Sequence, residues 1–231
     1  MAVKIFSGGA VQGLVGALSS EFKQATGATI DGEFSAVGGM RDRVLAGEAV
    51  DLIILTRSIV EDLVAKQHVH ADTVADVGLV ATCLAVRSGD SKPPVGDHEE
   101  LRSTLLSADE IHMGDPERST GGIHFAGVLS KLGIGDQVRG HLHTFRNGVT
   151  AMTALASSTA KQPIGCTQMT EVLSTDGVDL LAPLPTGCDL STTYTVGVST
   201  TARNPDVARI LARLLTSPDK EKARRAAGFT N

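Results

Sequence analysis

Short apolar runs alternate with amphipathic stretches along the first third of the chain. Apolar residues cluster in Val3–Ser7 and Asp51–Leu55, and residues 29–34 form a third strand-like run. Each run precedes residues with the three- and four-residue spacing of a helix face. These faces comprise Val11, Leu14, Val15, Leu18 and Phe22; Met40, Val44 and Leu45; and Ile59, Leu63 and Val64. The β-α order predicts an α/β fold with a parallel sheet covered on both faces.

The same alternation continues to the end of the chain. Asn204-Pro205 and Ser217-Pro218 each place a cap residue before a proline, which predicts two C-terminal helices, and Gly228 is a natural stop. Residues 180–199 form an irregular run that ends in a strand. The remaining predicted strands cover 77–86, 111–113, 141–145, 163–166 and 193–199, and the remaining predicted helices cover 99–106, the stretch up to about 132, and 149–156.

Four segments share a composition suited to binding an anion. They are Ser7–Gly13, Ser35–Met40, Arg118–His124 and Ser191–Tyr194, and each offers a small hydroxyl. The first three add glycine and open a helix, where unpaired N–H groups and roughly half a positive charge are available. Simple capping explains such residues in any one loop. Three such loops in one α/β pattern predict a shared site for a compact anion.

Arg41 and His124 are the charged or titratable candidates in these loops. Arg41 is predicted in the first turn of the second helix, where it would clamp a carboxylate or simply pair with Asp42 or Glu48. Arg57 and Arg118 are weaker candidates of the same kind. His124 is predicted one turn into a helix, where the positive helix end would keep the imidazole neutral and able to accept a proton. The alternative is a packed histidine bound to a backbone carbonyl.

Composition narrows the classes of partner. The 231 residues are 42% apolar, carry a net charge of −5 and are only 3% aromatic, so we expect a globular protein that does not bind nucleic acid. The chain has neither nucleotide-loop motif, G-x-x-x-x-G-K-[ST] or G-x-G-x-x-G, and no G-x-S-x-G or H-E-x-x-H. Cys83, Cys166 and Cys188 lack ligand spacing and are expected to be buried thiols, with no metal and no cofactor.

The sequence shows no membrane-spanning run and no secretion signal at its start. We therefore expect no membrane insertion and a cytoplasmic location as the sequence stands, or a periplasmic one if a leader has been removed.

Three stretches resemble the molybdate-binding receptors of ABC importers. "GDPERSTGGIHFAGVLSKLGI" resembles their "GDP…GxYA…LxxLG" segment, "FSAVGGMRDRVLAGEAVDLIIL" their serine-bearing second loop, and "TTYTVGVSTTARNPDVARILARLLTSP…GF" their C-terminal part. The resemblance implies the type II periplasmic-binding-protein fold, with two α/β lobes, two crossing strands and a ligand cleft between the lobes. Lobe 1 would hold residues 1–80 plus 197–231, and lobe 2 residues 81–196.

The resemblance also implies which residues contact the ligand. The oxyanion contacts of the family fall on Ser7, Ser35, the neighbourhood of Gly121 and Gly122, and Tyr194, and the same loops contain Gly8, Gly9, Ala36 and Thr120. Two functions remain open. The first is a solute-binding protein that closes around a small oxyanion or carboxylate and delivers it to the membrane component of an ABC importer. The second resembles aconitate isomerase: a cofactor-free enzyme in which Arg41 helps hold a polycarboxylate and His124, in place of the family's usual tyrosine, moves a proton.

Overall fold

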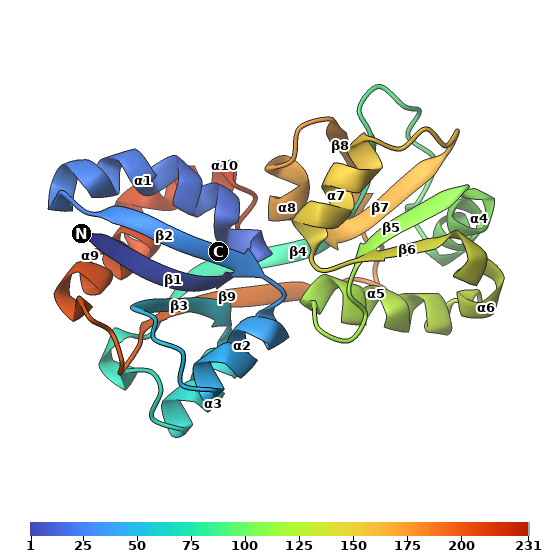
Figure 1. Cartoon of the computed structure of the whole chain (residues 1–231). Helices are drawn as coiled ribbons and strands as arrows, with labels where there is room; N and C mark the ends of the chain where they lie inside the picture. The colour runs from blue at the N-terminus through green and yellow to red at the C-terminus, as the bar shows by residue number, and fades with distance from the viewer. Residues whose placement is uncertain (231) are drawn as a thin grey trace. The chain divides into compact units, whose positions relative to one another are not determined.

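The computed structural model describes residues 1–230 and divides the chain into two compact units (Figure 1). Unit 1 contains residues 1–80 and the chain from 192 onward, and unit 2 contains Ala81–Ser191. The chain leaves unit 1 within strand β4 (Ala75–Arg87) and returns at the start of strand β9 (Ser191–Val198). Unit 1 resumes at Thr192, and β9 pairs with β3 of this unit from Tyr194 onward.

Unit 1 is a sheet in the order β2-β1-β3-β9 with helices on both faces. Strand β1 is parallel to both β2 and β3, whereas β9 is antiparallel to β3. Helix α1 packs against α9 on one face, and α2 and α3 lie on the other (Figure 1). The elements not yet given are β1 (Ala2–Gly8), β2 (Thr29–Ser35), β3 (Leu52–Thr56), α1 (Gln12–Thr26), α2 (Val37–Leu45), α3 (Arg57–Ala65), α9 (Pro205–Thr216) and α10 (Glu221–Ala226).

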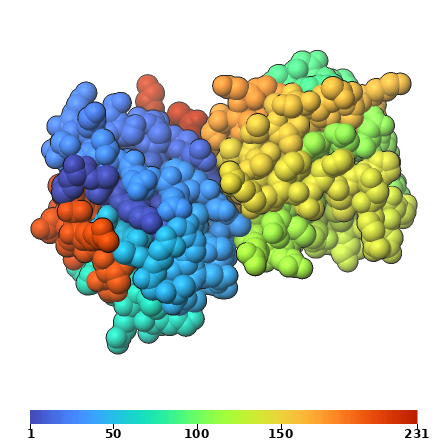
Figure 2. Space-filling view, in the orientation of Figure 1, coloured from blue at the N-terminus to red at the C-terminus, as the bar shows by residue number. Residues whose placement is uncertain are grey.

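Segments from both ends of the sequence build unit 1. Figure 2 shows the C-terminal helices in orange and red on the surface of the same unit as the N-terminal strand in blue. Thr230 closes the unit through backbone hydrogen bonds of 2.8 Å in both directions with Leu79. Strand β3 is buried along its whole length, as the apolar run Leu52–Leu55 predicts for a strand with both faces covered.

Unit 2 is a sheet in the order β4-β7-β5-β6, with β8 on the free edge of β4. Strand β5 is parallel to β6 and β7, and β4 is antiparallel to β7 and β8. Helices α4, α5 and α6 bury their apolar residues against one face, and α7 and α8 cover the other. Their bounds are β5 (Glu110–Gly114), β6 (Leu142–Phe145), β7 (Pro163–Gln168), β8 (Val178–Pro183), α4 (His98–Ser107), α5 (Thr120–Lys131), α6 (Gly135–Val138), α7 (Gly148–Ala156) and α8 (Met169–Leu173).

The structure confirms the predicted α/β order and corrects it in one region. Residues 180–199 are not one irregular run, because Val178–Pro183 forms strand β8 on β4. The sequence also gave no signal for α6 and α8, which have four and five residues. All three cysteines are free and buried, as expected. Across residues 1–230, no helix combines the length and the apolarity needed to cross a membrane.

Candidate ligand-binding site

In unit 1 the predicted residues gather at the carboxyl ends of the parallel strands. The register pairs Gly8, the last residue of β1, with Ser35, the last residue of β2. A Cβ on Gly8 would lie 2.9 Å from both Tyr194 Cε1 and Val37 Cγ1, so only glycine lets the backbone approach Tyr194 and the start of α2 this closely. Ligands of open α/β sheets bind at this edge.

The serines of unit 1 do not cap the helices that follow them. Helix α1 begins after a 3₁₀ turn (Gly9–Val11), and neither its N-cap nor Ala36, the N-cap of α2, makes a side-chain cap. Ser7 is fully buried and donates its hydroxyl to the Gly8 carbonyl at 2.9 Å. The half-buried Ser35 hydroxyl has no hydrogen-bond partner within residues 1–230. Local capping therefore does not explain these two serines.

The two candidate arginines of unit 1, Arg41 and Arg57, pair with acidic side chains. Arg41 lies in the second turn of α2, not the first as predicted, and its guanidinium binds Asp42 Oδ1 at 2.8 Å and 3.1 Å. The structure thus shows the ion pair with Asp42, which was the alternative to Arg41 binding the carboxylate of a ligand. Arg57, the first residue of α3, pairs with Asp76, whose carboxylate also accepts from Thr195 Oγ1 at 2.7 Å.

In unit 2 the third loop forms a capped N-terminus for α5. Ser119 Oγ accepts the N–H of Gly122 at 3.0 Å and donates to the Asp115 carbonyl at 2.9 Å. A Cβ on Gly122 would collide with the carbonyls of Gly114 and Asp115, so this position requires glycine. Helix geometry leaves the N–H groups of Thr120 and Gly121 without an intrahelical acceptor. The site hypothesis for this loop depends on those two groups, because Ser119 does act as a cap.

His124 lies one turn inside α5, as predicted, and binds a backbone carbonyl. Its Nε2 is 2.7 Å from the Cys188 carbonyl oxygen. Because a carbonyl only accepts, Nε2 carries the proton, and in a neutral ring Nδ1 is the acceptor. This is the packed arrangement weighed above as the alternative to a general base.

A second loop of unit 2 matches the third and was missed in the sequence. Arg146, Asn147 and Gly148 open α7 as Arg118, Ser119 and the following glycines open α5. Asn147 Oδ1 caps α7 by accepting the Thr150 N–H at 2.9 Å. The two helix starts adjoin, because a Cβ on Gly114 would collide with Ser119 Oγ and lie 3.6 Å from the Gly148 nitrogen. The arginine–cap–glycine order in "RNGVT" was the signal available in the sequence.

Glu171 is the other residue of this region that the sequence did not single out. It belongs to α8 and is only 5% exposed. Thr167 Oγ1 donates to its Oε2, and the amides of Gln168 and Val149 also hydrogen-bond to the carboxylate. Burial nevertheless raises the pKa of Glu171 above its usual range.

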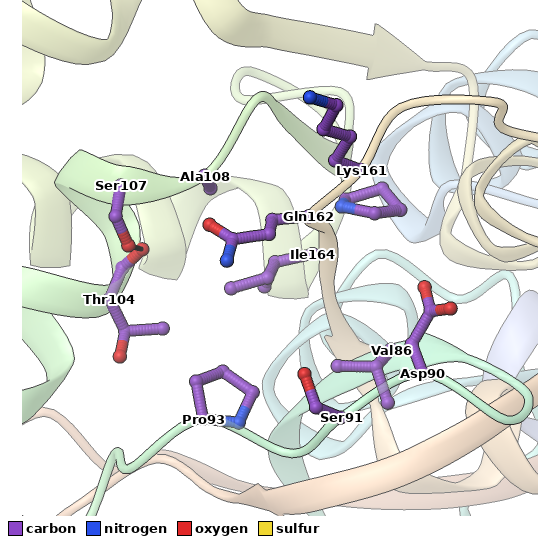
Figure 3. Close-up of a pocket in the computed structure, with 11 residues that line it drawn as sticks. Val86, Asp90, Ser91, Pro93, Thr104, Ser107, Ala108, Lys161, Gln162 and Ile164 are labelled. Carbon is purple, nitrogen blue, oxygen red and sulfur yellow. Dashed lines mark hydrogen bonds between the residues drawn. The ribbon is translucent and has the colours of Figure 1, made fainter.

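Two pockets lie away from the predicted residues, near the amino ends of parallel strands. The pocket in Figure 3 has about 400 Å³ of empty space, including space open to solvent, and Gln162 and Ile164 project toward it from the start of β7. The other pocket lies beside Lys4 and Asp51 in unit 1. Ligands of open α/β sheets bind at the opposite strand ends, so we do not place the candidate site in either pocket.

Comparisons with known proteins agree with this architecture. Aconitate isomerase of a Pseudomonas species is 23% identical over 97% of this chain and 86% of its own. The molybdate-binding protein ModA of Escherichia coli is 22% identical over 99% of this chain and 88% of its own. The solved periplasmic molybdate-binding protein of Azotobacter vinelandii superposes with a TM-score of 0.80 at 14% identity, over 99% of both chains.

The likeness to the solved structure identifies the fold as that of the periplasmic binding proteins, as the sequence motifs implied. The family model for bacterial extracellular solute-binding proteins matches residues 3–230. With that match, and with serine- and glycine-rich strand ends in each unit, the chain belongs to the family of bacterial extracellular solute-binding proteins.

Proposed function

We propose that this chain binds a small oxyanion or carboxylate as the solute-binding component of an ABC importer. The carrying observation is the pair of serines at the carboxyl ends of β1 and β2 that do not cap their helices. The proposed contacts in unit 1 are Ser7, Gly8, Gly9, Ser35, Ala36 and Tyr194. In unit 2 they are the N–H groups of Thr120 and Gly121, beside Gly122, whose own N–H donates to Ser119 Oγ.

The Ser35 hydroxyl and the loop N–H groups suit an anion because they can donate hydrogen bonds to it, whereas the buried Ser7 hydroxyl already donates to the Gly8 carbonyl. A hydroxyl that is half-buried and unpaired, such as that of Ser35, gains a charge-assisted bond when an anion replaces water. Helix N-termini add partial positive charge at α2 and α5. Names of relatives include molybdate-binding and sulfate-binding proteins, which supports the oxyanion class.

The partner in this proposal is the membrane component of the importer, and the site of action is outside the cytoplasm. The support is membership of a family described as extracellular solute-binding proteins. In the proposed cycle, the chain captures the ligand and the membrane component receives it.

Calorimetry and thermal shift with a panel of anions test the proposal. The panel contains molybdate, tungstate, sulfate, phosphate, and cis- and trans-aconitate. At about 100-fold excess over the dissociation constant, a ligand adds roughly 2.7 kcal/mol of stability. Ser35→Ala should weaken binding about tenfold or more, because a hydrogen bond to a charged group is lost. Ser19→Ala is the matched control, since Ser19 is a half-buried serine on α1, like Ser35, and its hydroxyl donates to the Gly16 carbonyl of the same helix. Equal affinities of the two variants would refute the assigned contact.

A second candidate is a cofactor-free isomerase that moves a proton and a double bond in a small polycarboxylate. The observation that favours it is the similarity to aconitate isomerase over 97% of this chain. His124 would use Nδ1 as the base, because Nε2 donates to the Cys188 carbonyl.

Proton NMR in heavy water separates the two candidates. An isomerase exchanges a ligand proton for deuterium and converts cis- to trans-aconitate. Loss of exchange in His124→Ala with retained affinity would assign the base. Binding without exchange in the wild type would rule out the isomerase and support only the solute-binding function.

A further inference from the structure

Glu171 places a buried carboxyl group at the start of α7. Val149, whose N–H bonds to the carboxylate, is the second residue of that helix. Gly148 packs directly on the group, because a Cβ there would collide with both Thr167 Oγ1 and Glu171 Oε2. The positive end of α7 is therefore neutralised from within the protein.

This charge lies beside the helix start that the proposed function uses. A Cβ on Gly121 would lie 3.6 Å from Thr167 Cα, so the first turn of α5 packs on the residue that binds Glu171. The Ser119 cap and Gly148 also flank Gly114 from two sides. An anion at the N–H groups of Thr120 and Gly121 would lie close to Glu171 in a region of low dielectric.

We propose that Glu171 is a specificity-determining residue, which makes the site favour singly charged anions over doubly charged ones of the same shape. The inference rests on the proposed function. Repulsion from a buried charge grows in proportion to the charge of the ligand, and solvent screens it little. The repulsion from Glu171 is therefore twice as large for a dianion as for a monoanion, whereas the loop amides can donate hydrogen bonds to both.

The surrounding groups are compatible with an ionised Glu171. All three of its bonding partners, the Thr167 hydroxyl and the amides of Gln168 and Val149, donate to the carboxylate and stabilise its charge against the effect of burial. Arg118 and Arg146 precede the two helix starts, but both are exposed. Solvent and salt screen their attraction for any anion.

Perrhenate and tungstate are the sharpest probes, because they are tetrahedral anions of similar size with one and two negative charges. Isothermal titration of the full chain should show tighter binding of perrhenate than of tungstate. Glu171→Gln keeps the shape of the side chain and removes its charge. It should increase tungstate affinity about tenfold more than perrhenate affinity.

Glu99→Gln is the matched control, because it removes the same charge from an exposed side chain of α4 in the same unit. It should leave the tungstate-to-perrhenate ratio unchanged. A merely structural role for Glu171 would weaken both anions alike and would not move this ratio.

Two results would overturn the inference while leaving the proposed function intact. One is tighter binding of tungstate than of perrhenate by the wild-type chain, which needs no variant to fold. The other is an unchanged ratio in a folded Glu171→Gln protein. Failure of every tetrahedral anion in the panel to bind would instead overturn the oxyanion site together with the inference.

Discussion

The two units bury their carboxylates at opposite ends of their sheets. Within residues 1–230, Asp51 of unit 1 and Glu171 of unit 2 are the acidic side chains classed as buried. Asp51 precedes β3 at its amino end and accepts the N–H groups of Lys4, Arg203 and Asn204 at 2.8, 2.7 and 3.1 Å. Glu171 follows β7 at its carboxyl end, beside the start of α7.

The two buried carboxylates therefore have different roles. Asp51 ties β1 to the turn before α9, at the strand ends remote from the candidate ligand contacts. The charge of Asp51 stabilises this connection within unit 1. Glu171 makes the same kind of bonds at the edge where an anion would bind, so its charge also acts on the ligand. The predictions below test this contrast, starting with the largest effect.

Asp51→Ala should destabilise unit 1 by about 3 kcal/mol, because three backbone N–H groups lose their acceptor in a buried position. The measurement is the free energy of unfolding in denaturant. The ratio of tungstate to perrhenate affinity should not change. Asp31→Ala, at an exposed acid of β2, is the control and should cost less than about 0.5 kcal/mol. A changed anion ratio in Asp51→Ala would erase the contrast between the units.

Gly148→Ala should destabilise unit 2 by about 2 kcal/mol, because the added methyl collides with Thr167 and Glu171 in a packed region. Gly39→Ala in α2 is the matched change in unit 1. No atom outside the local helix lies within 4 Å of its added Cβ, and the gain in helix propensity should stabilise by up to about 1 kcal/mol. Thermal unfolding of both variants checks the prediction, and a neutral Gly148→Ala would show that Glu171 is not confined.

Acidification should destabilise unit 2 through His112. This side chain is 4% exposed, binds Glu110 Oε2 at 2.9 Å through Nε2 and stacks on His143 and Phe145. Burial lowers the pKa of His112 below its usual 6.5, despite the opposing effect of Glu110. The unfolded state then binds more protons, so stability present above pH 6.5 falls toward the lowered pKa.

The expected loss is up to about 1 kcal/mol between pH 7.5 and 5.5. His112→Gln should flatten this part of the stability profile, and His141→Gln, at an exposed histidine, should not. A slope retained in His112→Gln would assign the proton to another group.

Glu48→Gln should give the smallest effect, although Arg43 and Lys4 lower the pKa of Glu48 to about 2. Its side chain is 38% exposed, so solvent and salt screen the ion pairs. Any stabilisation is present above pH 4.5 and is lost as the pH falls through about 2. The difference in melting temperature from wild type should vanish at about 0.5 M salt. A difference that persists in salt would place Glu48 with the buried carboxylates.

The sequence was informative where periodicity and loop composition agree. The β-α order of residues 1–65 and the start of α5 followed from apolar spacing and from Ser and Gly positions, whereas α2 begins earlier than the predicted place of Arg41 required. Two features of the candidate site were not predictable in this way. Glu171 is one acid in a five-residue helix, and its importance depends on Gly148, a distant residue that only the fold brings beside it. Strand β8 contains an apolar run in which apolar and polar residues do not alternate. The two-residue period that marks a strand is therefore absent from its sequence.

The split composition of unit 1 has a consequence for synthesis on the ribosome. Residues 81–191 form unit 2 as one uninterrupted stretch, whereas the sheet of unit 1 lacks β9 until residues 191–198 have been made. The sheet begun by residues 1–80 therefore cannot be completed until the chain from residue 192 onward has been made. Residues 81–191 can complete their own fold before that point. Until β9 has been made, one edge of β3 keeps its backbone N–H and C=O groups unpaired, and such an edge can pair with another chain.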